Sequence, residues 1–139
     1  MNTNLNPQEL VMNTKCDPRE FVVALLSRSQ CSVQVAACLA DKYGIFAWGI
    51  NHSGPTGMGE HAEVMCLRRA NPARVPASTL YVAARRRKSG RAVIARPCEA
   101  CARIASKCPE ISYRSQTGTW FTETKDVMWS LGLSKYPSK

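Results

Sequence analysis

The feature of the sequence that most restricts the fold is a pair of apolar runs separated by a short turn. The run Ser32–Leu39 is rich in Val, Ala and Cys without a helical stripe, and Ile45–Ile50 follows the turn Asp41-Lys42-Tyr43-Gly44. Two short strands joined by a tight turn that contains Gly are typical of a β-hairpin. Phe46 and Trp48 are two residues apart in the second strand, so we expect both on one face, as core residues.

Helix signals precede this hairpin. Asp17-Pro18-Arg19-Glu20 combines an N-cap residue, a proline at the first helical position and a Glu in a capping-box-like arrangement. The helix that it predicts carries apolar residues on one face, namely Phe21, Val22, Leu25 and Leu26. A weaker signal at Asn6-Pro7 predicts a short helix over Pro7–Met12.

The rest of the chain alternates between helical and strand-like segments. In order, the patterns predict a helix at His61–Ala70, a strand at Thr79–Ala84, a helix at Cys98–Ser106, strands at Ile111–Ser115 and Thr119–Thr122 around the turn Gln116-Thr117-Gly118, and a helix at Glu123–Leu133. This order predicts one mixed sheet with helices packed on its faces. We expect a single domain over 17–133, after an extension at 1–16 and before a tail at 134–139.

Composition excludes several classes of protein. With 139 residues, 45% hydrophobic and 21% charged, the chain can bury a core and is not disordered throughout. The longest apolar run, Phe21–Leu26, is far shorter than the roughly 20 residues that span a bilayer. No secretory signal opens the chain, so we expect a soluble, cytoplasmic protein without a membrane partner. In a reducing compartment its seven cysteines would be free or metal-bound.

The net charge of +9 is concentrated in one part of the chain. From Arg68 to Lys107 there are eleven basic residues and one acid, Glu99. The densest part holds Arg85, Arg86, Arg87, Lys88, Arg91 and Arg96, with Ser89-Gly90 as the expected tip of a loop. Such a patch suits a nucleotide phosphate or a nucleic-acid backbone. The alternative is a solvated loop whose charge keeps the protein soluble.

A pair of cysteines at the start of a predicted helix indicates a metal or redox site. In Pro97-Cys98-Glu99-Ala100-Cys101 the two thiols lie on adjacent turns, and the helix N-terminus favours their thiolate forms. Redox pairs and structural zinc sites share this motif. The other cysteines form no second pair, so we expect small buried or idle thiols at Cys16, Cys31, Cys38, Cys66 and Cys108.

His61 could add a third ligand, because it also opens a predicted helix. One His and two Cys on Zn²⁺ leave the fourth position open to water, as in a catalytic site. Glu63 lies two residues after His61 and could act on that position as a proton shuttle. Zinc lowers the pKa of bound water towards ~7, and a nearby carboxylate can then accept the proton.

His61-Ala62-Glu63 followed by Pro97-Cys98-x-x-Cys101 matches the signature of zinc-dependent nucleobase deaminases. From Pro18 to Thr122 the chain resembles the cytidine deaminase superfamily. The resemblance implies an α/β three-layer sandwich with a mixed five-stranded sheet and helices on both faces. It also implies a Zn²⁺ cofactor on His61, Cys98 and Cys101, Glu63 as general acid/base, hydrolytic release of ammonia, and homo-oligomers. The alternative is a zinc site kept for structure in an inactive relative.

One substrate contact is carried over from the same resemblance, and its neighbour His52 could also touch the substrate. Gly49-Ile50-Asn51 resembles the strand-end Asn that contacts the substrate sugar in this superfamily. The expected substrate-binding residues are Asn51, Ala62, His52 and Arg96. Asn51 is also an ordinary residue for the start of a loop, and His52 could face solvent.

The sequence departs from the motif pattern of each branch of the superfamily, so the resemblance does not identify the substrate. Asn51 stands without the Glu that nucleoside enzymes add, the link 86–96 is longer than in deoxycytidylate enzymes, and Arg96-Pro97-Cys98 replaces the Glu-Pro-Cys of transfer-RNA enzymes. The short connection between the last two strands favours an antiparallel pair, which resembles the cytidine and toxin-type branches. We therefore expect cytosine in a nucleoside or nucleotide as the substrate.

Two other functions stay open. A polynucleotide deaminase acting on single-stranded DNA or RNA would use the basic loop, with Tyr113, Trp120 and Trp129 as stacking surfaces or else as core residues. The third hypothesis is a zinc-stabilised nucleic-acid-binding module without catalysis, in which Glu63 would be dispensable.

Overall fold

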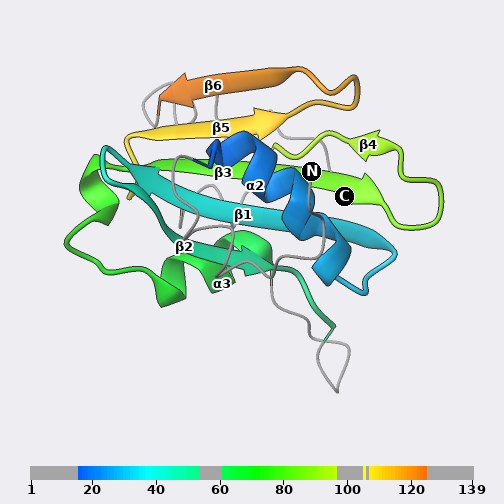
Figure 1. The fold of residues 1–139 in the computed structure, drawn as a ribbon, viewed down its shortest axis with the longest axis horizontal. Helices are drawn as coiled ribbons and strands as arrows, with labels where there is room; N and C mark the ends of the chain where they lie inside the picture. Colours follow the sequence, from blue (N-terminus) through cyan, green and yellow to red (C-terminus); the bar gives the residue numbers. More distant parts are fainter. Residues whose placement is uncertain (1–15, 54–60, 97–104, 106, 125–139) are drawn as a thin grey trace, which may run out of the picture.

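The computed structural model describes residues 16–53, 61–96, 105 and 107–124. The helices predicted at Pro7–Met12, Cys98–Ser106 and Glu123–Leu133 lie wholly or almost wholly outside these residues. Figure 1 shows the described part as a twisted sheet with one helix in front of it and one behind.

The sheet has the mixed character that the sequence predicts. Its main path runs β2-β1-β3-β5-β6, with the strands β1 (Val33–Asp41), β2 (Gly44–Ile50), β3 (Thr79–Arg86), β5 (Glu110–Arg114) and β6 (Trp120–Thr124). The strand β1 is antiparallel to both β2 and β3, β3 is parallel to β5, and β5 is antiparallel to β6. The expected antiparallel ending is therefore confirmed, and β6 continues to Thr124, where a helix was expected from Glu123.

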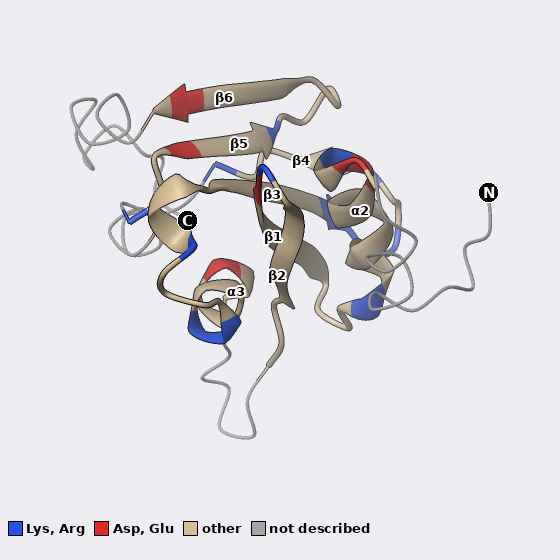
Figure 2. Ribbon diagram, turned by 60° about the vertical axis from the view of Figure 1, so that its left-hand side comes forward, with Lys and Arg blue, Asp and Glu red and all other residues tan. Residues whose placement is uncertain are grey.

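Helix α2 (Pro18–Leu25) covers one face of the sheet and continues into the short helix η1 (Leu26–Arg28). Asp17 is its N-cap, as predicted, and accepts a hydrogen bond from the backbone N–H of Arg19 at 3.1 Å. Helix α3 (Ala62–Arg69) covers the other face and leads to η2 (Val75–Ala77). Figure 2 shows the two helices on opposite sides of the strands, so the predicted three-layer arrangement is confirmed.

Strand alternation divides the core between these two faces. On the α3 face, Leu80 and Val82 of β3 pack with buried residues of α3 and β5. On the α2 face, Ala83 of the same strand packs with Phe21 and Leu25. No helix in the described part of the chain is long and apolar enough to cross a membrane.

The expectation that Phe46 and Trp48 share a face is wrong. Phe46 packs against the core on the α3 face, whereas Trp48 packs against the core on the α2 face. The pairing of β1 with β2 shifts between Leu39 and Ala40, so that Leu39 faces Ala47 and Ala40 faces Ile45. Phe46 is the extra residue of this bulge, and a bulge reverses the alternation of side chains along a strand.

The predicted basic loop is in fact a short hairpin. The strand β3 extends to Arg86, and Ala92–Val93 forms a further strand, β4, that is antiparallel to β3. At the tip, the N–H of Gly90 donates to the carbonyl of Arg86 at 2.8 Å, with a φ of 75° at Gly90. This backbone conformation favours glycine, which explains why the chain can turn there.

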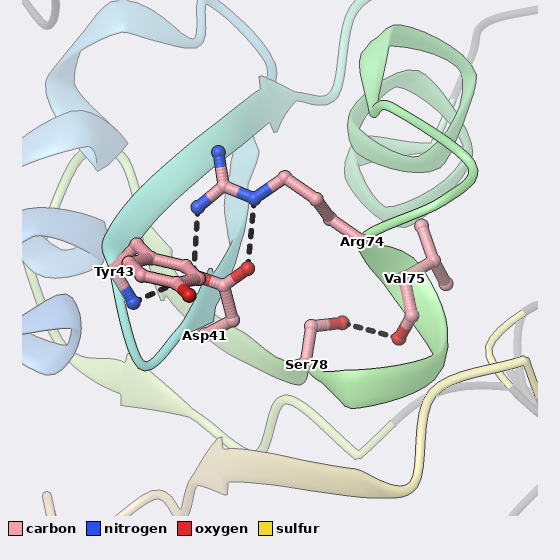
Figure 3. A network of polar contacts seen from close by, with 5 residues as sticks. All are labelled: Asp41, Tyr43, Arg74, Val75 and Ser78. Carbon is pink, nitrogen blue, oxygen red and sulfur yellow. Dashed lines mark hydrogen bonds and ion pairs between the residues drawn. The ribbon is translucent and has the colours of Figure 1, made fainter.

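An ion pair fastens the turn between β1 and β2 to the segment that follows α3. Arg74 donates to both carboxylate oxygens of Asp41, at 2.7 and 2.6 Å, and Asp41 also accepts from the N–H of Tyr43 (Figure 3). The Arg74 hydrogen bonds are the main reason why the pKa of Asp41 lies below its ordinary value. This contact lies at the end of β2 remote from Asn51.

Candidate active site

The start of α3 places an exposed imidazole beside a buried carboxylate. His61 is the N-cap residue with an extended backbone, and its side chain makes no capping hydrogen bond. Its carbonyl accepts from the N–H of Met65 at 3.1 Å. Two residues later, in the first turn, Glu63 is only 6% exposed. An exposed His61 and a buried Glu63 therefore stand at the start of one helix, and their roles as zinc ligand and proton shuttle stay predictions.

Gly49 allows α3 to lie directly against β2. A Cβ atom at position 49 would be 2.6 Å from the carbonyl oxygen of Ala62 and 2.7 Å from the backbone nitrogen of Cys66. Real Cβ atoms do not approach other atoms this closely, so any larger residue would push the helix away. One residue further on, the N–H of Ile50 lies 3.5 Å from the sulfur of Met65. The first turn of α3 is therefore fixed against the end of β2.

The side chain of Asn51 extends the hydrogen bonding between β2 and β1. Its Oδ1 accepts from the Ser29 hydroxyl at 2.6 Å and from the N–H of Val35 at 2.9 Å, and its Nδ2 donates to the carbonyl of Val33 at 2.8 Å. An Asn amide has two donor and two acceptor positions. These contacts use three of the four, so one N–H is left over among the described residues.

The five cysteines outside the predicted metal pair are free thiols. Cys38, Cys66 and Cys108 are buried, which confirms that they are core residues. Burial raises the pKa of all three thiols, for Cys108 to about 11. Such thiols stay protonated at neutral pH and are poor zinc ligands. Cys16 and Cys31 are half-buried.

The predicted zinc ligands are only partly within the described chain. Cys98 and Cys101 lie outside it, and among the described residues no three His, Cys, Asp or Glu side chains are grouped to hold a metal ion. His61 fits a zinc site by its imidazole chemistry. Glu63, buried two residues after His61, has the carboxylate chemistry of a proton carrier near such a site.

Arg96 is held by an acidic residue of the last described strand. Its guanidinium lies 3.5 Å from Oε1 of Glu123, and both side chains are largely buried. The other oxygen of Glu123 accepts from the Tyr113 hydroxyl at 2.8 Å. These contacts fix the residue just before Pro97 to the sheet. These contacts do not test whether Arg96 binds substrate, so that role stays a prediction.

The remaining predicted contacts are spread around this end of the sheet. His52 is exposed next to Asn51, and Ala62 is fully buried at the first position of α3. Tyr113 is buried against Phe121 and belongs to the core, whereas Trp120 is half-buried and packs edge-on against Tyr81 beside the α2-face core. Trp129 lies outside the described residues.

Sequence reasoning missed the residues that support this site. Gly49 carried a usable signal, because a glycine inside a strand often marks a close backbone approach. Ser29 contacts Asn51, and Gln34 contacts Arg85, across the sheet. Neither Ser29 nor Gln34 carried a usable signal in the sequence.

Two solved structures share this architecture. The crystal structure of cytidine deaminase from Burkholderia pseudomallei is 19% identical, with a TM-score of 0.64 over 80% of this chain and 92% of that one. Cytidine deaminase from Mycobacterium leprae is 15% identical, with a TM-score of 0.55 over 91% of this chain and 98% of that one. No protein-family model and no curated protein sequence matches. The chain thus has the cytidine deaminase fold.

Proposed function

We propose that this protein is a zinc-dependent hydrolytic deaminase that converts cytosine to uracil in a nucleoside or nucleotide. The observation that supports it most directly is the pairing of exposed His61 with buried Glu63 at a helix start that Gly49 fixes against β2. This pairing occurs in a cytidine deaminase fold, with a Cys-x-x-Cys pair further along the chain.

The metal would be held by His61, Cys98 and Cys101. When bound, Zn²⁺ supplies Lewis acidity and makes a water molecule nucleophilic near neutral pH. The same three ligands leave one coordination position for that water. The positive end of the α3 dipole favours the negative charge that develops nearby.

Glu63 would move the protons of the reaction. Water adds its oxygen to C4 of cytosine, and the C4–N bond breaks to release ammonia, so the net change is hydrolysis. In this scheme Glu63 accepts a proton from the attacking water, delivers it to ring atom N3, and later assists the departing amine. A buried carboxylate held in the first turn of a helix is well placed for repeated transfer, because its position is fixed by packing.

Asn51 would orient the sugar. Three of its amide positions hold β1 and Ser29, so the remaining N–H of Nδ2 could donate to a ribose or deoxyribose hydroxyl. His52, Ala62 and Arg96 remain predicted contacts around the same substrate.

Ammonia release from cytidine, deoxycytidine and their monophosphates tests the proposal. Glu63→Gln should lower the turnover rate by about 10² to 10⁴ while zinc content and melting temperature stay near those of the unaltered protein. Glu110→Gln is the matched control, because Glu110 is exposed at the far end of β5. Full activity of Glu63→Gln would refute the proposed role.

Single-stranded nucleic acid is the second candidate substrate. The observation in its favour is the exposure of Arg86, Arg87, Lys88 and Arg91 on the β3–β4 hairpin. Oligonucleotides that contain cytosine therefore belong in the same activity screen.

A further inference from the structure

Two arginines lie near one another at the end of the sheet, on the α2 face. Arg85 is on β3 two residues after Ala83, which packs in the α2-face core. Arg114 ends β5 directly after Tyr113, which packs in the α3-face core. Alternation along each strand therefore directs both guanidinium groups to the α2 face. Because β3 and β5 are parallel, both arginines also lie at the same end of the sheet.

The charges of this pair are not neutralised within the described part of the chain. Arg85 donates through Nε to the amide oxygen of Gln34 at 2.7 Å, and Arg114 donates through NH2 to the carbonyl of Ala84 at 3.4 Å. Both acceptors are uncharged. The Nε of Arg114 is buried and has no hydrogen-bond partner among the described residues. Burial lowers the pKa of Arg114, and the nearby charge of Arg85 lowers it further.

Such an arrangement is unfavourable without an anion. Two like charges that are partly removed from water repel each other, and a buried N–H without a partner costs free energy. A phosphate bound by the half-exposed guanidinium groups would neutralise the pair, since a guanidinium group matches phosphate geometry.

Exposed cations extend this site along the surface. The β3–β4 hairpin contributes Arg86, Arg87, Lys88 and Arg91, and η1 contributes Arg28. Arg87 fixes the hairpin to the segment before β1, because its N–H donates to the carbonyl of Ser32 at 2.9 Å and its guanidinium to that of Gln30 at 3.0 Å. The hairpin and the end of η1 therefore lie at one end of the molecule (Figure 1).

Hydrogen bonds link the arginine pair to the residue proposed to hold the sugar. The buried Gln34 amide donates to the carbonyl of Ser29 at 2.6 Å while accepting from Arg85. The hydroxyl of Ser29 donates to Asn51. Only two side chains thus separate Asn51 from Arg85.

We propose that Arg85 and Arg114 bind a backbone phosphate of a single-stranded nucleic acid. The pair lies on the α2 face and Glu63 on the α3 face, so this phosphate belongs to a nucleotide next to the target and not to the target itself. A single strand is specified because a deaminase cannot reach a base inside a duplex. The single strand, the position next to a target base and the identity of that base rest on the proposed function, whereas the binding of a backbone phosphate by the arginine pair does not.

Binding of a fluorescent single-stranded oligonucleotide with one central cytosine, measured by anisotropy over a range of salt concentrations, tests the proposal. In the full chain, the double variant Arg85→Gln, Arg114→Gln should bind about tenfold more weakly. The slope of log affinity against log salt should become shallower by about 0.7 for each phosphate that the variant no longer neutralises. Lys42→Gln removes one charge from the exposed turn between β1 and β2, at the opposite end of the sheet, and should change neither quantity.

A second variant keeps the result interpretable if the double variant unfolds, which thermal melting would reveal. Arg114→Lys retains the charge but not the fork of donors, so it should weaken binding while leaving the salt slope nearly unchanged. Binding by either Arg variant equal to that of Lys42→Gln, or equally tight binding of a duplex, would overturn the proposal. Ammonia release from cytidine by the unaltered protein is measured separately, so a failure of the deaminase function would leave the binding result standing.

Discussion

Gly49 in β2 lies so close to Ala62 in α3 that a Cβ atom at position 49 would be 2.6 Å from the Ala62 carbonyl oxygen. The helix start that carries His61 and Glu63 can take this position only because residue 49 has no side chain. This contact makes Gly49 the most sensitive test of how the fold holds the candidate active site.

Gly49→Ala should therefore displace α3. We expect a loss of about 1–3 kcal/mol in the free energy of unfolding, as for other overpacked sites, together with a larger loss of deaminase activity. Gly118→Ala is the control, because Gly118 has a φ of 88° and open space around it. It should destabilise through backbone strain alone and keep the activity per folded molecule. Equal activities of the two variants would argue against this role of Gly49.

Asn51→Asp should separate the structural and substrate roles of this residue. The carboxylate keeps the two acceptor positions, but Val33 loses its donor and the sugar loses the proposed N–H. We expect a cost of about 1–3 kcal/mol in stability and a raised KM for cytidine. Ser29→Ala removes a bond to the same amide and leaves its N–H groups in place, so it should destabilise with a smaller change in KM. An unchanged KM in Asn51→Asp would exclude the sugar contact.

Thiol counting with an aromatic disulfide reagent tests the zinc site without measuring activity. In the native protein only the half-buried Cys16 and Cys31 should react, with Cys16 slower because burial raises its pKa. A zinc chelator should release Cys98 and Cys101, and denaturant should expose all seven cysteines. Rapid reaction of Cys98 and Cys101 before chelation would contradict zinc ligation.

The ion pair between Asp41 and Arg74 should make stability depend on acid pH. Arg74 holds the folded-state pKa of Asp41 below the unfolded value of about 3.9. The stabilisation is therefore fully present above about pH 3.9 and is lost as the pH falls through the lower folded-state value. Asp41→Asn should cost about 1 kcal/mol at pH 7 and less in strong acid. Urea unfolding at several pH values measures this, and an identical pH profile for the variant would refute it.

Local signals in the sequence predict much of the fold. The Asp17-Pro18 start of α2, the turn before Gly44 and the helix start at His61 depend on neighbouring residues, and the structure places each element where the signals do. The bulge at Leu39 and Ala40 depends on how β1 meets β2, so alternation alone put Phe46 and Trp48 on one face.

The site was predictable only where a motif marks it. His61 and Glu63 follow from residue types and spacing in one short stretch. Ser29 reaches Asn51, and Gln34 reaches Arg85, across the sheet from other strands and loops, and such pairs leave no periodic pattern in the chain. The strand β4 is short and rests on only two residue pairs with β3. The segment that contains it is charged and rich in turn residues, so its sequence gives no strand pattern.

The contact between Arg96 and Glu123 has a consequence for the order of assembly. The hairpin β1–β2 and helix α3 use one continuous stretch, 33–69, so the half of the site around Glu63 closes over short loops. Arg96 instead contacts Glu123 in β6, the last described strand, which is synthesised after the stretch 33–69. During synthesis this contact can therefore form only once the α3 half is already available. The two halves of the candidate active site would then form at different times. The half around α3 would fold before the contact between Arg96 and Glu123 attaches the residue before Pro97 to the sheet.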